Sequence, residues 1–489
     1  MLKPGIGFGV YLNVTKTDLD AVVVGSGPNG LAAAIVLQQR GLSVLLLEAK
    51  QTIGGGMRSE ELTLPGFVHD VCSAVHPMAV LSPFFNTLPL EEHGLTYIYP
   101  PVAAAHPFDG GGAALLGGTV EETGRALGKD EEAYRLLIGG LVKDWPQIGG
   151  DIMGPLPFWS RHPFKMARFG WHALSAATAL AERWHTKEAR GLWAGMAAHS
   201  MLPLTRPTSS AIGLILMTAA HLKGWPVARG GSGAIARALS SYFVSLGGKI
   251  ETGVEVRSLA QLPSSRAVLL DMTPRQLLGL GGHRWSALYK GQLERYRYGP
   301  GVFKIDWALD APIPFAAPGC RNAGTVHLGG ELEEIERAEA AIWKGGSSEK
   351  PFVLLAQQSI FDPSRAPAGK QVAWGYCHVP AGSTEDMTSR IEAQVERFAP
   401  GFRDRILARH TMNSVAMETY NGNYIGGDIG GGVVDMRQLF TRPALRWSPY
   451  RTSEKGIYIC SSSTPPAGGV HGMCGFHAAQ RALRDVFGG

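Results

Sequence analysis

The sequence lacks several features that mark whole classes of protein. Its five cysteines stand far apart, without a CxxC or CxxxxC pair, which argues against a disulfide framework, a zinc site or any other metal centre, and a redox-active dithiol. No run of 18 apolar residues occurs, so no segment is expected to span a membrane. There is also no run of Lys and Arg, and the net charge of +5 is therefore not expected to bind nucleic acid.

The first 17 residues contain neither a long apolar core nor a convincing cleavage site. We expect residues 1–17 to be an N-terminal extension rather than a signal peptide, and the cytoplasm to be the location of the protein. The length of 489 residues, with 45% hydrophobic and 18% charged residues, is typical of a globular protein of two or three domains.

Glycine is abundant, at 64 residues or about twice its average share. The glycines gather in short clusters, as expected where a chain turns tightly or approaches a ligand. The clusters are at residues 25–30, 54–56, 230–233, 426–432 and 468–475.

The N-terminal part of the chain predicts a compact βαβ unit. Residues 20–25 form a buried-strand pattern, and a turn over 26–30 follows it. Apolar residues then recur at helical spacing over 31–40, and Gly41 provides a helix stop. Residues 43–48 form a second buried strand, so a hydrophobic parallel sheet is expected here.

Further along the chain, strand patterns return only after a long interval. Strands are predicted over 249–256, 266–271 and 456–460, helical patches over 119–127 and 173–183, and an acidic helix over 331–343 within a strand-rich region. We therefore predict a nucleotide-binding domain built from three separated segments and a second, substrate or lid domain built from two insertions. The first comprises residues 18–105, 227–295 and 426–489, and the second residues 106–226 and 296–425.

The turn between the two N-terminal strands carries a GxGxxG motif. Gly25 permits the sharp turn, Gly27 lets a pyrophosphate approach the backbone, and Gly30 allows helix and strand to pack closely. Pro28 suits the first helical turn, and the helix N-terminus offers free N–H groups to phosphates. Glu48, at the end of the second strand, can accept hydrogen bonds from a ribose diol. A purely structural turn is the alternative to a dinucleotide site, and the motif alone leaves both NAD and FAD open as the dinucleotide.

Three further segments resemble one family of flavoproteins. The run IGGGMR at 53–58, the middle segment beginning GWPVARGGSG at 224, and the C-terminal stretch GIYICSSSTPPAGGVHGMCGFHAAQRAL resemble the amine oxidase and phytoene desaturase superfamily of FAD enzymes. In particular they resemble bacterial phytoene desaturase-like oxidoreductases and relatives named pyridine nucleotide-disulfide oxidoreductase domain-containing proteins. The resemblance covers nearly the whole chain and is strongest at both ends.

The resemblance implies an α/β fold, with a discontinuous, glutathione reductase-like Rossmann domain for FAD and an inserted α+β substrate domain. No motif for covalent attachment is matched, so the FAD is expected to be non-covalent. The implied cofactor-binding residues are Gly25, Ser26, Gly27, Pro28, Asn29 and Gly30 at the pyrophosphate; Glu48, with Ala49 beside it, at the adenosine ribose; Gly55, Gly56, Met57 and Arg58 along the pyrophosphate and ribityl chain; Val256 at adenine; and Ser462, Ser463, Gly469, Val470 and Met473 at the ribityl and isoalloxazine portions.

Catalytic residues are harder to select, because the flavin carries the hydride chemistry itself. His471 lies within the flavin motif and is a candidate proton acceptor or electrostatic partner; its alternative is a packing residue at a helix start. His76 and Ser73 follow the glycine-rich run, where a turn-stabilising role is the alternative. Tyr420 belongs to an aromatic loop that forms either a cavity wall or a connector, and Asp428 follows it.

Dehydrogenation or desaturation of a largely apolar small molecule, by hydride transfer to flavin N5, is the function that the resemblance implies. A flavin-dependent isomerase without net redox change and a non-catalytic flavin-binding interaction protein are the alternatives. Oxygen and a quinone are the candidate electron acceptors. The aromatic and basic stretch 158–171 is a candidate for peripheral membrane contact, and a lid or ordinary core packing are its alternatives.

Overall fold

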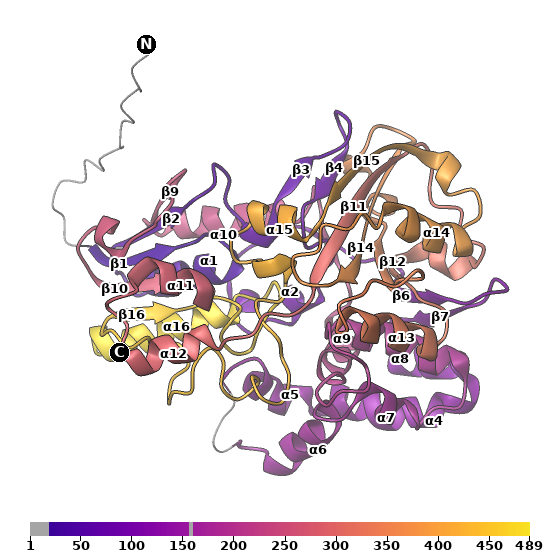
Figure 1. Ribbon diagram of the computed structural model, residues 1–489, viewed down its shortest axis with the longest axis horizontal. Coiled ribbons are helices and arrows are strands. Elements are labelled where there is room, and N and C mark those ends of the chain that lie inside the picture. Colours follow the sequence, from indigo (N-terminus) through magenta and orange to yellow (C-terminus); the bar gives the residue numbers. More distant parts are fainter. Residues whose placement is uncertain (1–18, 156–159) are drawn as a thin grey trace.

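The computed structural model describes residues 19–155 and 160–489. The expected N-terminal extension, 1–17, and positions 158 and 159 of the aromatic and basic stretch lie outside the described residues. Two large sheets, two short strand pairs and a helical layer make up the described structure (Figure 1). No helix in the described ranges has the length and apolar character needed to cross a membrane.

The first sheet has five parallel strands in the order β16-β10-β1-β2-β9. Its strands come from three distant parts of the chain: β1 (Leu19–Val24), β2 (Val44–Glu48), β9 (Lys249–Thr252), β10 (Ser265–Leu270) and β16 (Ile457–Ile459). The predicted βαβ unit and α/β fold class are thereby confirmed. The strand expected over 249–256 ends at Thr252, because Gly253 turns the chain with a φ of +74°.

Helices cover both faces of this sheet. Alternate residues of β1 explain why: Ala21 and Val23 face one core cluster and Val22 and Val24 the other. On the first face α1 (Pro28–Gln38) packs against α10 (Gly233–Ser245) and α16 (Met473–Ala482). The second face is covered by α11 (Pro274–Gly281) and α12 (Ala287–Glu294).

The second sheet has seven strands in the order β15-β11-β14-β13-β12-β6-β7. All its neighbours pair antiparallel except β6 and β12, which are parallel. The strands are β6 (Val102–Pro107), β7 (Ala113–Leu116), β11 (Gly301–Leu309), β12 (Ala323–Leu328), β13 (Val353–Ala356), β14 (Gln371–Val379) and β15 (Ile406–Met412). The region 296–425 is thus strand-rich, as predicted.

Helices also lie on both faces of the second sheet. One core cluster joins it to α14 (Thr388–Phe398), and another joins its opposite face to α8 (Lys187–Ala198), α9 (Ala211–Lys223) and α13 (Leu332–Ile342). The acidic helix predicted over 331–343 is α13. The helical layer is completed by α3 (Val120–Ala126), α4 (Glu131–Tyr134), α5 (Gly140–Ile152), α6 (Pro163–Ala173) and α7 (Ala177–Ala181).

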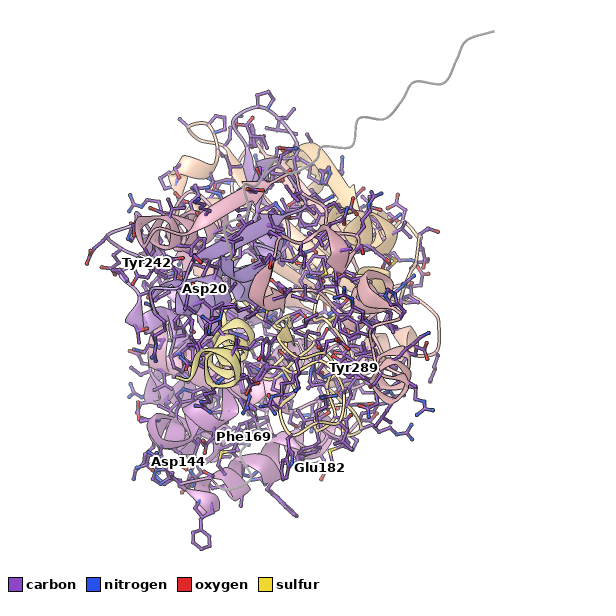
Figure 2. All side chains as sticks on the ribbon, turned by 90° about the vertical axis from the view of Figure 1, so that its left-hand side faces the viewer. Asp20, Asp144, Phe169, Glu182, Tyr242 and Tyr289 are labelled. Atoms are coloured by element: carbon purple, nitrogen blue, oxygen red, sulfur yellow. The ribbon has the colours of Figure 1, made fainter. Side chains whose placement is uncertain are left out.

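Figure 2 places Asp144 of α5 and Phe169 of α6 at the lower end of the molecule, away from the five-stranded sheet. The remaining elements are short: α2 (Pro77–Leu81), α15 (Ser414–Tyr420), the hairpin of β3 (Ser59–Glu61) with β4 (Val68–Asp70), and the pair β5 (Tyr97–Ile98) and β8 (Val227–Ala228).

Candidate functional site

A cavity of about 890 Å³ joins the two halves of the fold. On one side it is lined by the loops that follow β1, β2 and β10, where the chain leaves the carboxyl edge of the parallel sheet. In open α/β sheets, ligands bind in the crevice at this edge. The other side is lined by α6, α9, β13 and β14, which belong to the helical layer and the second sheet.

The glycine motif forms a tight cradle at the start of α1. Gly25 has a backbone φ of +101°, which residues other than glycine rarely adopt. A Cβ on Gly30 would lie 1.9 Å from the carbonyl oxygen of Gly25, so only glycine lets helix and strand come this close. Gly27 and Gly55 also approach each other, because a Cβ on Gly55 would lie 3.0 Å from Cα of Gly27. Gly25 and Gly30 therefore have the local roles that their places in the motif predict, whereas the pyrophosphate contact of Gly27 stays a prediction.

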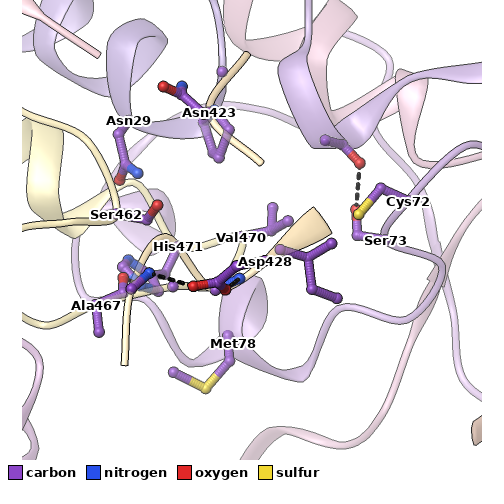
Figure 3. A pocket seen from close by; sticks show the side chains of 18 of the residues that line it. Asn29, Cys72, Ser73, Met78, Asn423, Asp428, Ser462, Ala467, Val470 and His471 are labelled. Atoms are coloured by element: carbon purple, nitrogen blue, oxygen red, sulfur yellow. Dashed lines mark hydrogen bonds between the residues drawn. The ribbon is translucent and has the colours of Figure 1, made fainter. Parts of the chain in front are cut away.

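The N-terminus of α1 provides donors without an acidic partner on its own helix. Gly27 is the N-cap residue and offers no side-chain cap, and no acidic residue occurs in the first turn. Oδ1 of Asn29 is buried without a hydrogen-bond partner in the described chain. Figure 3 shows the Asn29 side chain beside the open space that Asn423, Ser462 and Met78 also surround. An anionic group at this helix end would complement both the free N–H groups and the helix dipole.

Glu48 is buried at the end of β2 and is held by several donors. Oε2 accepts hydrogen bonds from the backbone N–H of Ser26 at 3.0 Å and from its hydroxyl at 2.5 Å. Oε1 accepts from the N–H of Lys50 at 2.9 Å and from the guanidinium of Arg58 at 3.1 Å. Arg58 also donates to the carbonyl oxygens of Thr52 and Gly55. Glu48 thus fixes the cradle as well as facing the cavity.

Asp271 is a functional candidate that the sequence analysis missed. It follows β10, and its Oδ2 accepts the N–H of Gly30 at 3.1 Å. Burial, opposed by that hydrogen bond and reinforced by the charge of Glu48, raises the pKa of Asp271 to about 7. The available signal was its position: an acid directly after a buried strand, at the sheet edge that also carries the glycine motif.

The C-terminal motif reaches the cavity between β16 and α16. Ser462, Gly469, Val470 and His471 all line the cavity, together with Ala467 and Gly468. Both ring nitrogens of His471 are engaged: Nε2 lies 3.1 Å from the carbonyl oxygen of Ala467, and Nδ1 accepts the N–H of Met473 at 3.0 Å. Burial lowers the pKa of His471 to about 4, so the ring is neutral and caps α16. This geometry favours the packing alternative for His471.

The other candidate side chains also face the cavity. Nε2 of His76 is hydrogen-bonded to the hydroxyl of Ser232 at 2.8 Å, and burial lowers the pKa of His76 to about 4. Ser73 donates to the carbonyl oxygen of Gly56 at 3.0 Å. The Tyr420 hydroxyl donates to the carbonyl oxygen of Gly55 at 2.8 Å, so this tyrosine is part of the cavity wall. Asp428 accepts three backbone N–H groups, those of Gly299, Gly430 and Gly432.

Most of the predicted cofactor-binding residues come together in the cavity lining. Those that do so are Gly25, Ser26, Gly27, Pro28, Asn29, Glu48, Ala49, Gly55, Gly56, Arg58, Val256, Ser462, Gly469 and Val470. Four others lie behind the lining: Gly30 packs against Gly25, Met57 and Met473 join a core cluster, and Ser463 donates to the carbonyl oxygen of Gly431 at 2.9 Å.

The apolar wall of the cavity was not predicted residue by residue. It is formed by Met166, Phe169, Ile212, Ile215, Leu216, Trp225, Trp343, Leu354, Trp374 and Tyr376. These residues carry no motif, because any large apolar side chain can serve in such a wall. No cluster of three or more His, Cys, Asp or Glu suited to a metal ion occurs within 19–155 and 160–489.

The fold and the glycine cradle define a protein with a Rossmann-like dinucleotide-binding domain. The family model for the NAD(P)-binding Rossmann-like domain matches residues 23–88. Across almost its full length the chain is similar to pyridine nucleotide-disulfide oxidoreductase domain-containing protein 2 of Rattus norvegicus, with 26% identity over 96% of this chain and 94% of that protein.

Solved structures share the fold over the same extent. An oxidoreductase from Methanosarcina mazei matches with a TM-score of 0.64 and 16% identity, over 95% of this chain and 100% of the other. Putrescine oxidase bound to putrescine matches with a TM-score of 0.60 and 17% identity, over 97% of this chain and 100% of the other. The resemblance to pyridine nucleotide-disulfide oxidoreductase domain-containing proteins, expected from the motifs, is confirmed, and the resemblance to amine oxidases is confirmed for the fold.

Proposed function

We propose that the protein is an FAD-dependent oxidoreductase that removes a hydride from a largely apolar small molecule. The observation that carries this proposal is the single cavity that joins the glycine cradle to an aromatic and aliphatic wall. A dinucleotide held in the cradle can extend toward that wall, so a substrate lying against the wall has access to its reactive end. The names of the similar proteins, which include oxidoreductases, support the same class of activity.

The residues present fit FAD. The N-cap residue Gly27 has no side chain to cap α1, and the close approach of Gly27 and Gly55 forms a backbone cradle at the place proposed for the pyrophosphate. Glu48 and Val256 also line the cavity, and we propose that Glu48 binds the adenosine ribose and that Val256 contacts adenine. The residues that line the cavity between β16 and α16 are proposed to hold the ribityl chain and the isoalloxazine ring.

When bound, FAD supplies the acceptor for a hydride leaving a substrate carbon. The protein's own part is to hold that carbon in place and to exclude water. The wall does both, since its tryptophans and aliphatic side chains offer apolar contact over a large surface. Neither nitrogen of His471 is available to a substrate, and we therefore propose no histidine base at this position.

The carboxylates of the cavity argue against a cationic amine as the substrate. Glu48, Asp271 and Asp428 are each held by the donors described above. The other two, Glu255 and Glu418, are paired with Arg257 and Arg275. The apolar wall itself contributes no carboxylate among the described lining residues, so a buried ammonium group would find no counter-charge there. The proposed substrate is therefore uncharged.

The test is anaerobic reduction of the holoprotein by a panel of metabolites, followed by readmission of oxygen. We expect an uncharged apolar compound to bleach the flavin absorbance, and re-oxidation by oxygen to distinguish an oxidase from a dehydrogenase. Reduction by amines alone would contradict the proposed substrate class, and a flavin that no compound of the panel reduces would contradict the proposed activity.

A Gly27→Val variant checks the cradle in the same preparation. A Cβ at Gly27 would lie 2.8 Å from Oδ2 of Asp271 and would occupy the space proposed for the pyrophosphate. We expect this variant to be isolated folded and colourless. Full flavin absorbance in this variant would refute the assignment of the pyrophosphate to this turn.

A further inference from the structure

Two histidines form a buried pair at the edge of the apolar wall. His199 ends α8 and lines the cavity, whereas His327 lies on β12 and is fully buried. Their Nε2 atoms are 3.0 Å apart, and the rings meet edge to face with centroids 5.1 Å apart. Burial lowers the pKa of His199 to about 3 and that of His327 well below its ordinary value. Both rings are therefore neutral, and one Nε2 donates to the other.

The surroundings of His327 decide which ring is the donor. Its Nδ1 is buried without a partner in the described chain. This nitrogen lies close to α8, because a Cβ built on Gly195 would be 2.7 Å from it. If His199 were the donor, His327 would carry a buried N–H with no acceptor, which folded proteins rarely tolerate. His327 therefore keeps its proton on Nε2 and donates to His199.

This assignment leaves the proton of His199 on Nδ1. No described residue accepts a hydrogen bond from Nδ1, and His199 keeps accessible surface although it lies inside the molecule. The nearby His378 bonds through Nδ1 to both carboxylate oxygens of Glu339, at 2.8 and 3.0 Å, and its Nε2 has no hydrogen-bond partner in the described chain, so it makes no bond to the pair. His199 thus lines the cavity with a neutral ring whose Nδ1–H has no acceptor among the described residues.

We propose that His199 binds a neutral acceptor oxygen of the substrate and that His327 is the positioning residue that fixes its tautomer. The chemical class is then an apolar molecule that bears a carbonyl, hydroxyl or ether oxygen. This inference rests on the proposed function, since it assigns the polar contact of the proposed substrate. A carboxylate ligand is disfavoured, because a neutral imidazole supplies no counter-charge for a buried anion.

The test is ligand binding by the holoprotein, measured without turnover. Limonene and carvone have the same carbon skeleton and differ by one carbonyl oxygen, so they are matched probes. Binding is followed by quenching of tryptophan fluorescence, since Trp225, Trp343 and Trp374 line the cavity. One additional hydrogen bond predicts that carvone binds about ten-fold more tightly than limonene. Equal binding of the two probes, or binding of neither, would overturn the proposal.

Variants assign the preference to the histidine pair. In His199→Phe we expect both probes to bind with the affinity of limonene. His327→Gln supplies an N–H donor to His199 and keeps the preference, whereas His327→Leu reduces it; a merely structural role would not separate these two variants. Tyr376→Phe is the control, because Tyr376 of β14 also lines the cavity and carries a hydroxyl that can donate a hydrogen bond. Loss of the preference in Tyr376→Phe, with retention in His199→Phe, would assign the contact to Tyr376 and overturn the proposal.

The probe experiment separates this inference from the proposed function. A carvone preference that depends on His199, in a protein whose flavin no apolar compound reduces, would leave the inference standing and refute the activity. Flavin reduction by apolar compounds, with carvone and limonene bound equally tightly by the wild type and by every variant, would support the proposed activity and refute the inference about His199.

Discussion

We predict that Asp271 makes the proposed binding of FAD depend on pH in a way that can be measured. Its carboxyl group lies at the glycine cradle, 3.1 Å from the N–H of Gly30 and 2.8 Å from the Cβ position of Gly27. Burial is the main cause of its pKa of about 7, with a further contribution from Glu48. An ionised carboxylate here would repel the pyrophosphate, so we expect the protonated form to be the one that binds FAD.

The size of the expected change in FAD affinity follows from the pKa of Asp271. With a value near 7, about 90% of the apoprotein is protonated at Asp271 at pH 6 and about 10% at pH 8, so the apparent Kd for FAD rises about ten-fold across this interval. Asp271→Asn removes the charge and keeps an oxygen that can accept the N–H of Gly30. We expect this variant to bind FAD equally at both pH values.

The assay is reconstitution of the apoprotein with FAD, followed by flavin fluorescence at pH 6, 7 and 8. Glu255→Gln is a matched control, because Glu255 is an exposed carboxylate of the same cavity that is paired with Arg257, and this variant should keep the wild-type pH dependence. Equal affinity of the wild type at pH 6 and pH 8 would refute the reasoning, as would an Asp271→Asn variant that retains the ten-fold change.

The raised pKa of Asp271 also predicts that the stability of the apoprotein depends on pH. Because the folded-state pKa of Asp271 lies above its ordinary value of 3.8, its contribution to stability is fully present below about pH 4 and is lost as the pH rises through about 7. A displacement of this size corresponds to about 4 kcal/mol. Asp271→Asn should therefore raise the Tm of the apoprotein at pH 8 and change it little at pH 4.

Two further predictions concern packing and the surface. Gly30→Ala should lower the Tm and the FAD content, because its Cβ would lie 1.9 Å from the carbonyl oxygen of Gly25 and overpacking costs about 1–3 kcal/mol. Gly150→Ala is the control and should be tolerated, because there is open space at its Cβ position. Equal Tm values for the two variants would contradict this prediction. Phe164 and Trp171 of α6 are 91% and 74% exposed, and we propose that α6 contacts a membrane through them. Replacing both with Ser should then weaken co-sedimentation of the protein with anionic vesicles. Wild-type protein that stays in the supernatant would refute the contact.

The sequence predicted the parts of the fold that carry strong local patterns. The βαβ unit was readable because buried strands, a glycine turn and a helical period follow one another within 20–48. The strands β6 and β7 were missed, since β7 has only four residues and β6 also pairs with β12, which lies more than 200 residues away along the chain. Such long-range pairing leaves no local signal.

The candidate site likewise contains some residues that the sequence predicted and others that it did not. The cradle was predicted from spacing, because phosphate binding requires glycine at fixed positions. Asp271 and His199 were not, since a single acid or histidine becomes informative only when its neighbours are known. His471 illustrates the converse: its position in a motif was readable, but the two hydrogen bonds that engage its ring were not.

The central claim is that distant segments of the chain together bind one FAD. Its most direct test is to purify the protein natively, record its visible absorbance, and identify any nucleotide released by acid. The account predicts a yellow protein that releases FAD in an amount equal to that of the chain. A folded protein that is colourless and takes up no FAD on incubation would contradict it.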